Sequence, residues 1–395
     1  MPIEFQPDNR LKLLQCGVEY FPALLAAIDA AEREIFLESY IFADDDVGRA
    51  VAAALARAAQ RGVLVQVLVD GFGGGEFPRT LAPEMQADGV RVLIYRPEIA
   101  SLRGRFRLKR HRLRRLHRKL AVIDCQVAFV GGINIESDFN VPGHTAPRYD
   151  FAVQVEGPLV AAVRGTMVRV WEIVVWANFR HRYRVGQLDT PAPVASTAAP
   201  GQGQRAALLI RDNLRHRRDI PEAYLEAIAA AQQEVVIANA YFLPGRRLRH
   251  ALMDAAQRGV SVIVLLQGRV EYRLQHYATQ ALYGALLAAG VRIFEYRASF
   301  LHAKVGVVDG VWATVGSANM DPFSLLLARE ANVVAHDRPF AAELRERLGE
   351  ALGEDAREVR ANDWRRLGLV ARGLRWTAYY MVRIGLSLVG LGDRY

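Results

Sequence analysis

Cysteine and long apolar runs are both scarce in this sequence. Its 395 residues include two cysteines, Cys16 and Cys125, which are too few for a disulfide framework and favour a reducing compartment. No apolar run reaches the roughly 20 residues that a membrane-spanning helix needs, because Arg383 interrupts the nearest candidate, Trp376–Leu391. Met1–Gln6 has no apolar segment of the secretory type. We therefore expect a protein that lies on a membrane, if it meets one, rather than one that crosses it.

Acidic residues are also in deficit. There are 42 Asp and Glu against 51 Lys and Arg, which gives a formal net charge of +9. This balance indicates an anionic partner, which can be nucleic acid, an acidic membrane surface or a phosphorylated substrate. The composition, 51% apolar and 24% charged, is otherwise that of a globular protein, and the length allows two domains.

The sequence contains an internal duplication. The first half reads AAEREIFLESYIF, AAQRGVLVQVLVDG, DGVRVLIY and HRKLAVIDCQVAFVGGIN, and the second reads AAQQEVVIANAYF, AAQRGVSVIVLLQG, AGVRIFEY and HAKVGVVDGVWATVGSAN. Four anchor pairs occur in the same order, namely Tyr40 with Tyr241, Val63 with Val260, Val90 with Val291, and His117 with His302. A repeat of this length predicts two similar structural units.

Each half alternates apolar strands with amphipathic helices. Ile35–Phe42 is a short apolar run typical of a buried strand, Val47–Gln60 has helical spacing and ends near Gly62, and Val63–Val69 is the next strand. This β-α-β order predicts an α/β fold, with two tandem domains whose mixed sheets are flanked by helices and related by a pseudo-twofold axis around one active site.

The expected domain boundaries follow from composition. Residues 189–204 are rich in Pro, Ala, Ser and Gly and are typical of a linker. We therefore expect a first domain at 1–188, a second domain at 205–360 and a basic amphipathic C-terminal tail at 361–395.

Both halves carry the motif H-x-K-x4-D-x6-G-[GS]-x-N. We take as candidate catalytic residues His117, Lys119, Asp124, His302, Lys304 and Asp309. We take as candidate phosphate-binding residues Asn134, Asn319 and Ser317. A single HxK pair is common on protein surfaces, but two full motifs at equivalent positions of a duplicated chain argue against that interpretation.

The residue types fit phosphoryl transfer. Imidazole can attack phosphorus and can also protonate a leaving alkoxide, because its pKa lies near neutrality. Two facing imidazoles can divide these tasks between a covalent nucleophile and a general acid and base. Lysine and asparagine supply donors to the non-bridging oxygens, so we expect no metal and no cofactor.

At these residues the chain resembles the phospholipase D superfamily, whose signature is the paired HKD motif. Within it the chain is similar to bacterial cardiolipin synthases, most of all the B branch. This likeness covers roughly residues 11–345 and rests on LESYIFADDDVGRAV, RRLHRKLAVIDCQVAFVGGIN, YDFAVQVEGPLV, RDNLRHRRDI, IANAYFLPG and GSANMDPFSLLLAREANVV.

The resemblance implies a two-step exchange. One histidine takes a phosphatidyl group from phosphatidylglycerol with release of glycerol, and a second phosphatidylglycerol then accepts it to give cardiolipin. By analogy His117 is the nucleophile and His302 the acid and base, while Asp124 and Asp309 brace the site. The family also has an acidic residue after each motif that orients the histidine. Asp150 and Glu330 match, and we expect each to partner the histidine of its own half.

Two basic segments indicate a membrane surface. Arg103–Lys119 contains ten Arg and Lys residues, and Trp364–Leu391 places arginines among aromatic and aliphatic residues. A solvated charge run and a helix packed on the domain are the alternatives. We expect peripheral binding to the cytoplasmic face of the cell membrane, phosphatidylglycerol as substrate, and neither nucleic acid nor an obligate protein partner.

Three other functions stay open. A phospholipase D would pass the phosphatidyl group to water, a nuclease of the same superfamily would cleave nucleic acid, and a non-catalytic membrane-binding protein would use the fold alone. The intact motifs argue against the last. Tyr40 and Tyr241 end equivalent strands and are candidates for lining the site or for core packing.

Overall fold

The computed structural model describes residues 3–96, 114–140, 146–180, 183–184, 203–212, 215–365 and 368–388. Most of the Arg-rich segment, residues 103–113, and most of the expected linker, residues 189–202, lie outside the described residues. The division into two domains, a linker and a tail stays a prediction.

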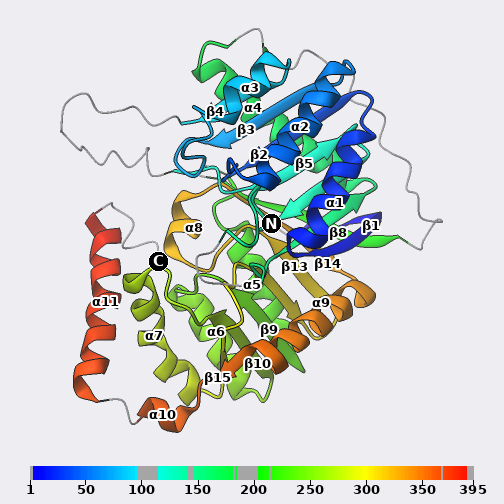
Figure 1. The fold of residues 1–395 in the computed structure, drawn as a ribbon. Helices are drawn as coiled ribbons and strands as arrows, with labels where there is room; N and C mark the ends of the chain where they lie inside the picture. Colours follow the sequence, from blue (N-terminus) through cyan, green and yellow to red (C-terminus); the bar gives the residue numbers. More distant parts are fainter. Residues whose placement is uncertain are drawn as a thin grey trace, which may run out of the picture.

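Apart from one short helix before the last strand of the second half, the two halves of the chain contain equivalent elements in the same order (Figure 1). The first half consists of β1 (Gln6–Gln15), α1 (Cys16–Asp29), β2 (Glu34–Ser39), α2 (Asp46–Gln60), β3 (Leu64–Asp70), α3 (Leu81–Ala87), β4 (Arg91–Tyr95), β5 (Lys119–Ile123), β6 (Val127–Gly131), β7 (Phe151–Glu156) and α4 (Leu159–Ala177). The second half consists of β8 (Gln204–Arg211), α5 (Asp219–Ala230), β9 (Glu234–Asn239), α6 (Arg246–Gln257), β10 (Ser261–Gln267), α7 (Arg273–Ala288), β11 (Arg292–Tyr296), β12 (Lys304–Val308), β13 (Trp312–Gly316), α8 (Pro322–Leu327), β14 (Glu330–His336) and α9 (Arg338–Glu350). After the second half come a π-helical turn (Ala351–Asp355), β15 (Ala356–Glu358), α10 (Ala361–Arg365) and α11 (Leu369–Leu388).

The strands form one mixed sheet in the order β15-β11-β10-β9-β12-β13-β14-β8-β1-β7-β6-β5-β2-β3-β4. Apart from β15, the order reads the same from both ends once each strand is replaced by its equivalent in the other half. The halves join where β1 pairs antiparallel with β8, with Gln6 opposite Ala206 and Asn9 opposite Gln204. The predicted α/β fold and its pseudo-twofold relation are therefore confirmed, and the two sheets are also continuous by hydrogen bonds.

Local sequence signals explain the elements around the site. Every residue of β2 is buried, because helices cover both faces of the sheet, which accounts for its continuous apolar character. Helix α2 begins at an N-cap where the Asp45 carboxylate accepts a hydrogen bond from the Gly48 N–H at 2.8 Å. Gly62 follows α2 with φ +92°, the left-handed conformation that a glycine tolerates best.

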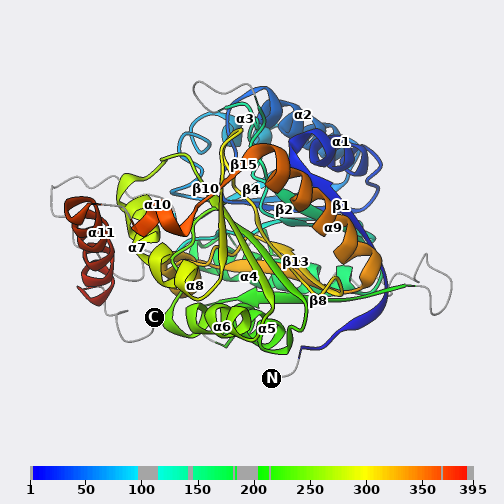
Figure 2. The same ribbon diagram turned by 90° about the horizontal axis from the view of Figure 1, so that it is seen from below.

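Helices cover both faces of the sheet in each half (Figures 1 and 2). Helices α1, α2 and α3 pack on one face of the first half, and α5, α6 and α7 pack on the equivalent face of the second. The opposite faces of the two halves share one core with α4 and α9, which joins β5–β7 to β12–β14. The halves are therefore held together by a common apolar interior, and the starts of β5 and β12 meet at its edge.

Candidate active site

Backbone pairing between the halves places the two histidines. The His117 N–H donates to the carbonyl of Arg329 at 3.0 Å, and the His302 N–H donates to the carbonyl of Tyr149 at 2.8 Å. These contacts belong to two parallel bridges, one between Leu116 and Arg329 and one between Leu301 and Tyr149. Each histidine thus enters its strand alongside a segment of the other half.

Both histidines line one cavity of about 620 Å³ at the junction of the halves. Its walls include residues from both halves, namely Tyr40, Phe72, Arg115, His117, Asn134, Glu136, Arg148, Tyr241, Glu271, Tyr272, Gln275, Phe300, His302, Asn319, Asp321, Ser324, Leu327 and Glu330. The side chains of His117 and His302 are 16% and 17% exposed, so a ligand in the cavity can reach both rings.

The first histidine is held by a carboxylate of the second half. His117 Nδ1 lies 3.0 Å from both carboxylate oxygens of Glu330. The Ser317 hydroxyl donates to Glu330 Oε2 at 2.6 Å, and the Ser324 hydroxyl donates to Oε1. Ser317 is therefore behind the carboxylate and does not line the cavity, so its expected role in binding phosphate is wrong.

The second histidine is held by a carboxylate of the first half. His302 Nδ1 lies 2.6 Å from Asp150 Oδ2, and the Lys304 ammonium lies 3.5 Å from the same oxygen. Gly132 stands where the second half has Ser317, and a Cβ atom at Gly132 would overlap the Asp150 carboxylate. The glycine of this motif is thus required by the closeness of Asp150, whereas the equivalent serine is accommodated by Glu330.

The expected pairing of each carboxylate with the histidine of its own half is wrong. The pairs are crossed, His117 with Glu330 and His302 with Asp150. The reason is the pair of parallel bridges, which align Arg329 with Leu116 and Tyr149 with Leu301 and so bring the next residue of each segment beside the histidine. The carboxylates do contact the histidines, as expected, but across the junction.

Burial sets the protonation of the site. It lowers the pKa of His117, and Glu330 only partly offsets this. It lowers the pKa of His302 well below the ordinary value, and repulsion from Lys304 and Arg148 lowers it further. Both rings are therefore neutral at neutral pH in the absence of ligand.

The two carboxylates respond to burial differently. Burial alone would raise the pKa of Glu330, but His117, Lys119 and the Ser317 hydrogen bond outweigh it, and the pKa is lowered. Burial raises the pKa of Asp150 in spite of the nearby Lys304. An ionised Glu330 can only accept, so His117 carries its proton on Nδ1 and presents an unprotonated Nε2 to the cavity.

Both motif lysines are buried beneath the histidines. The Lys119 ammonium donates to the carbonyl of His117 at 2.7 Å, and Lys304 makes the equivalent bond to His302. Burial lowers the pKa of Lys119 to about 7, and repulsion from Lys304 contributes. Burial likewise lowers the pKa of Lys304 to about 8, against the effect of Asp150. A phosphate in the cavity would favour the charged form of both.

Asparagine and aspartate of each motif lie in different places. Asn134 and Asn319 line the cavity, as expected for residues that meet a ligand. Asp124 and Asp309 follow the far ends of β5 and β12, and a strand rises about 3.3 Å per residue, which puts them about 20 Å beyond the histidines. Neither lines the cavity. Their assignment as catalytic residues is therefore wrong.

The motif aspartates instead fix the start of the neighbouring strand in the sheet. Asp124 accepts hydrogen bonds of 2.8–2.9 Å from the N–H groups of Glu32, Arg33 and Glu34 at the start of β2. Asp309 accepts equivalent bonds from Gln232, Gln233 and Glu234 at the start of β9. These aspartates therefore brace the sheet at a distance from the cavity, and a bracing role for the site itself stays a prediction.

Several cavity residues have no signal in the motifs. Tyr40 and Tyr241 line the cavity, as considered from their place at strand ends, but Phe72, Arg115 and Glu271 were not found from sequence. These three lie in loops whose sequences differ between the halves, so the repeat could not mark them. Arg118, between the first His and Lys, pairs with Glu38 at 2.8 and 2.9 Å behind the strand, away from the cavity walls.

Within the described ranges, no three His, Cys, Asp or Glu side chains are grouped as a metal site requires. The site of this structure is defined by imidazoles, carboxylates and ammonium groups. With its duplicated α/β sheet, such a site defines a protein of the phospholipase D type.

Comparisons with known proteins place the chain within that class. A family model described as "Cardiolipin synthase, PLD-like domain" matches residues 24–142 and 224–352. Cardiolipin synthase B of Escherichia coli strain K12 is 38% identical over 359 residues, which cover 91% of this chain and 84% of that protein. Cardiolipin synthase A of Pseudomonas putida is 32% identical over 360 residues, with 91% and 71% covered. The chain therefore belongs to the cardiolipin synthase family of phospholipase D-like proteins.

Solved structures with little sequence identity share the fold. Phosphatidylserine synthase from Haemophilus influenzae superposes with a TM-score of 0.68 at 14% identity, covering 98% of this chain and 97% of that one. Polyphosphate kinase from Porphyromonas gingivalis gives a TM-score of 0.58 at 15% identity, covering 89% of this chain and 49% of that one. At such low identity these matches show the fold alone.

Proposed function

We propose that this protein is a phosphatidyltransferase that synthesises cardiolipin, moving a phosphatidyl group from one phosphatidylglycerol to another with release of glycerol. The observation that carries the proposal is the junction cavity, where His117 and His302 stand with a carboxylate behind each ring. The likeness to cardiolipin synthases over most of the chain supports the substrate class.

In the first step His117 is the nucleophile. Its unprotonated Nε2 attacks the phosphorus of phosphatidylglycerol, a P–N bond forms, and the P–O bond to glycerol breaks. The anionic phosphodiester favours the protonated form of His302, which then donates its proton to the departing glycerol oxygen. The Glu330 carboxylate stabilises the positive charge that the phosphorylated imidazole acquires.

In the second step a hydroxyl group of another phosphatidylglycerol attacks the same phosphorus. His302 takes the proton of that hydroxyl, the new P–O bond forms, and the P–N bond to His117 breaks. Lys119, Lys304, Asn134 and Asn319 serve the non-bridging oxygens through charge and hydrogen bonds. Every step uses side chains of this chain, and the proposal includes no cofactor.

The function is tested by incubation with phosphatidylglycerol in detergent micelles, with lipid products separated by thin-layer chromatography. We expect cardiolipin and an equal amount of glycerol. Phosphatidic acid in place of cardiolipin would indicate a phospholipase D. No lipid turnover together with nicked DNA would indicate a nuclease and overturn the proposal.

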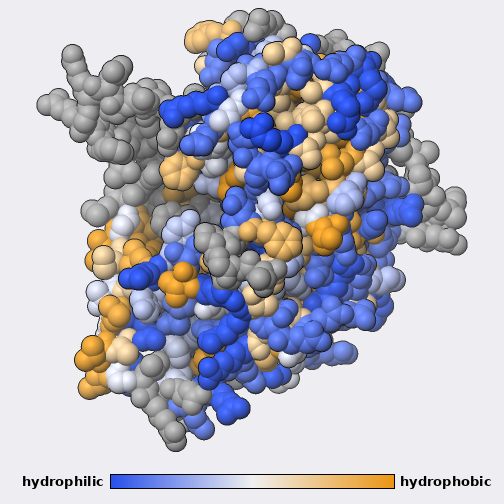
Figure 3. Space-filling view, in the orientation of Figure 1, coloured by the Kyte–Doolittle hydropathy of each residue, from blue (hydrophilic) through white to orange (hydrophobic). Residues whose placement is uncertain are grey.

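We also propose that α11 docks on an anionic membrane surface, at the cytoplasmic face. None of the described helices combines the length and apolar composition needed to cross a bilayer. One face of α11 packs on the second half through Ala378, Val382 and Leu386. The exposed side carries seven large apolar side chains, Leu369, Val370, Leu374, Trp376, Tyr380, Met381 and Ile384, and lies at the edge of the molecule (Figures 2 and 3).

A cationic groove beside these residues favours an anionic lipid. The groove, of about 470 Å³, lies between α6, α7 and α11. It is lined by Arg246, Arg249, His250 and Arg383 together with Trp376, Tyr379 and Tyr380. Arginine with aromatic residues suits a phosphate head group at the level of an interface.

Membrane docking is tested with the double variant Leu374→Glu, Ile384→Glu. Sedimentation with vesicles of phosphatidylglycerol and phosphatidylcholine should fall severalfold, because two charges enter the apolar side of the helix. The matched control is Val18→Glu, which changes an exposed apolar residue on α1. Equal sedimentation of the double variant and the wild type would contradict the proposal.

A further inference from the structure

The two ends of the cavity differ in one pair of equivalent tyrosines. The ring of Tyr40 lies 4.8 Å from the ring of His117, and its centroid lies 5.3 Å from the Lys119 ammonium. The Tyr241 hydroxyl instead donates to Glu271 Oε2 at 2.5 Å, and its ring lies 6.0 Å from Tyr272. The two halves therefore differ at this position, because Tyr241 binds a carboxylate whereas Tyr40 packs beside a histidine and a lysine.

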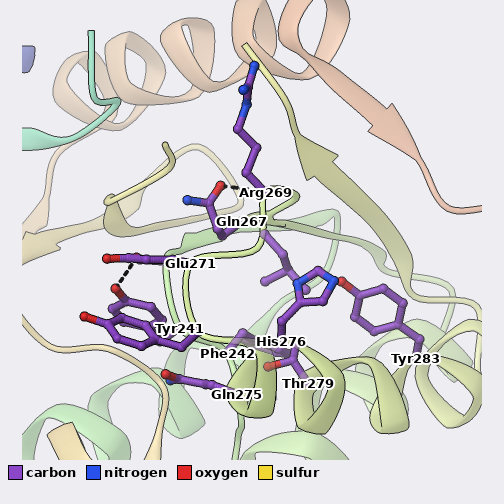
Figure 4. A pocket seen from close by; sticks show the side chains of 12 residues that line it. Tyr241, Phe242, Gln267, Arg269, Glu271, Gln275, His276, Thr279 and Tyr283 are labelled. Carbon is purple, nitrogen blue, oxygen red and sulfur yellow. Dashed lines mark hydrogen bonds between the residues drawn. The ribbon is translucent and has the colours of Figure 1, made fainter. Parts of the chain in front are cut away.

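These residues lie on the His302 side of the cavity. The chain before Tyr241 pairs with the segment before Lys304, since the Ala240 N–H donates to the carbonyl of Ala303 at 2.9 Å. Glu271 lies between β10 and α7, and Gln275 lies in the first turn of α7. Figure 4 shows Tyr241, Glu271 and Gln275 together at one side of the adjoining small pocket, with His276 and Tyr283 at the other.

The chemistry of this group suits hydroxyl groups. A carboxylate accepts hydrogen bonds from alcohols and repels phosphate, while an amide and a phenol both donate and accept. Burial raises the pKa of Tyr241, and the charge of Glu271 raises it further, so the phenol keeps its proton. The wall opposite is different, because the Arg115 guanidinium lies 4.3 Å from the centre of the Phe72 ring and offers a cationic, apolar surface.

The order of bond changes places an alcohol at this end. In a double displacement through one histidine, the leaving alcohol departs opposite the new P–N bond, and the attacking alcohol arrives from that same side. If His117 is the nucleophile, both alcohols occupy the His302 side. That is the side where Tyr241, Glu271 and Gln275 lie.

We propose that Tyr241, Glu271 and Gln275 form the alcohol subsite, in which Glu271 accepts a hydrogen bond from a free hydroxyl of the glycerol head group. This assignment rests on the proposed phosphatidyl transfer and adds a residue that selects a polyol over a simple alcohol or water. A site built to bind a hydroxyl discriminates against an analogue that lacks it.

The test is a competition between glycerol and 1-propanol for the phosphatidyl group. The donor is the p-nitrophenyl ester of phosphatidic acid in detergent micelles, so that nitrophenol reports total turnover and chromatography separates phosphatidylglycerol, phosphatidylpropanol and phosphatidic acid. We expect the wild type to favour glycerol. Glu271→Leu should lower the ratio of phosphatidylglycerol to phosphatidylpropanol about tenfold, and Glu271→Gln should lower it less.

The matched control is Glu76→Gln, an exposed carboxylate of the loop after β3 that does not line the cavity. Its product ratio should equal that of the wild type. An unchanged ratio in both Glu271 variants would overturn the subsite while leaving phosphatidyl transfer intact. A wild type that shows no preference for glycerol would do the same. A wild type that releases no nitrophenol would instead overturn the proposed function.

Discussion

The two histidines occupy equivalent positions of the duplicated fold, but their carboxylates are held differently. Glu330 receives two serine hydroxyls and contacts His117 with both oxygens. Asp150 is one methylene shorter, has Gly132 in place of a serine, and shares one oxygen between His302 and Lys304. The duplicated fold thus holds two similar imidazole rings in surroundings that have diverged.

This divergence favours different tasks for the two rings. The pKa of Glu330 is lowered, although burial opposes this, whereas burial raises the pKa of Asp150. A fully ionised carboxylate stabilises an imidazole that becomes a cation, as a phosphorylated nucleophile does. Burial and repulsion from Lys304 lower the pKa of His302 well below its ordinary value, so this ring gains a proton when the anionic phosphate enters and can then give and take it.

Replacing either histidine should abolish cardiolipin formation, but the two variants should differ with an activated donor. His117→Ala and His302→Ala should each lose at least about 1,000-fold in steady-state rate. The p-nitrophenyl ester needs no proton donor for its leaving group, so His302→Ala should still give a burst of nitrophenol and a labelled protein. His117→Ala should give neither.

The measurement is rapid-mixing absorbance of nitrophenol together with mass mapping of the labelled peptide. Wild-type protein quenched at early times serves as the control. A label on His302, or a burst in His117→Ala alone, would reverse the assignment of nucleophile and acid.

Removing the charge of each carboxylate tests the crossed pairing. Glu330→Gln should lower the rate of the nitrophenol burst about 10- to 100-fold, since carboxylates that orient a functional histidine contribute effects of that size. Asp150→Asn should preserve the burst and slow the later turnover with phosphatidylglycerol. A carboxylate favours the protonated imidazole, so Glu330→Gln should lower the pKa of His117 further and Asp150→Asn that of His302.

Histidine titration followed by nuclear magnetic resonance checks the direction of both shifts. The two variants control each other, because each should leave the other ring nearly unchanged. If Asp150→Asn suppressed the burst and Glu330→Gln did not, the carboxylate that supports the nucleophile would not be the one that contacts His117 in the structure.

Elements with periodic sequence patterns were predictable from the sequence, whereas contacts between the halves were not. The alternation around Ile35–Phe42 and Val47–Gln60 predicted β2 and α2 to within a few residues, because buried strands and amphipathic helices leave periodic signals. The crossed pairs were missed since they depend on bridges between Leu116 and Arg329 and between Leu301 and Tyr149, more than 150 positions apart. The position of Asp124, about 20 Å beyond His117, follows from the length of the strand between them, so sequence alone can place it away from the reacting groups.

A smaller effect concerns the buried lysines, whose surroundings also differ. Lys304 has an ion pair with Asp150 at 3.5 Å, whereas the described ion pairs include none for Lys119. Burial lowers the pKa of Lys119 to about 7, and the unfolded value is near 10.4. The unfolded chain therefore binds more protons between these values, and the contribution of this group to stability rises with pH.

Lys119→Met should therefore stabilise the folded protein at pH 7 by about 1–3 kcal/mol while removing activity. The difference in free energy of unfolding between this variant and the wild type should decrease towards pH 9, by up to about 1.4 kcal/mol per pH unit. Lys304→Met, which leaves Asp150 without its ion pair, should stabilise less. Thermal unfolding at pH 7 and pH 9 measures these differences. Equal changes in melting temperature for the two variants at both pH values would contradict the expected order.

The smallest and most symmetric effect is expected where the halves are alike. Asp124 and Asp309 each accept three backbone hydrogen bonds at the start of a strand, so Asp124→Ala and Asp309→Ala should each lower stability by about 1–2 kcal/mol. Burial would raise the pKa of Asp309, but the three N–H donors outweigh it and lower the pKa. Its stabilisation is therefore present above pH 4 and is lost as pH falls through the lowered pKa.

Activity per folded molecule should be unchanged in both aspartate variants, since neither side chain reaches the cavity. Urea unfolding measures the loss, and Asp88→Ala, an exposed aspartate at the end of α3, is the matched control. A lower turnover rate without a lower free energy of unfolding would indicate that these aspartates have a catalytic role. Unequal losses of stability would mean that the duplicated scaffold has diverged as well as the site, because equal hydrogen-bond sets on equivalent strands should contribute equally.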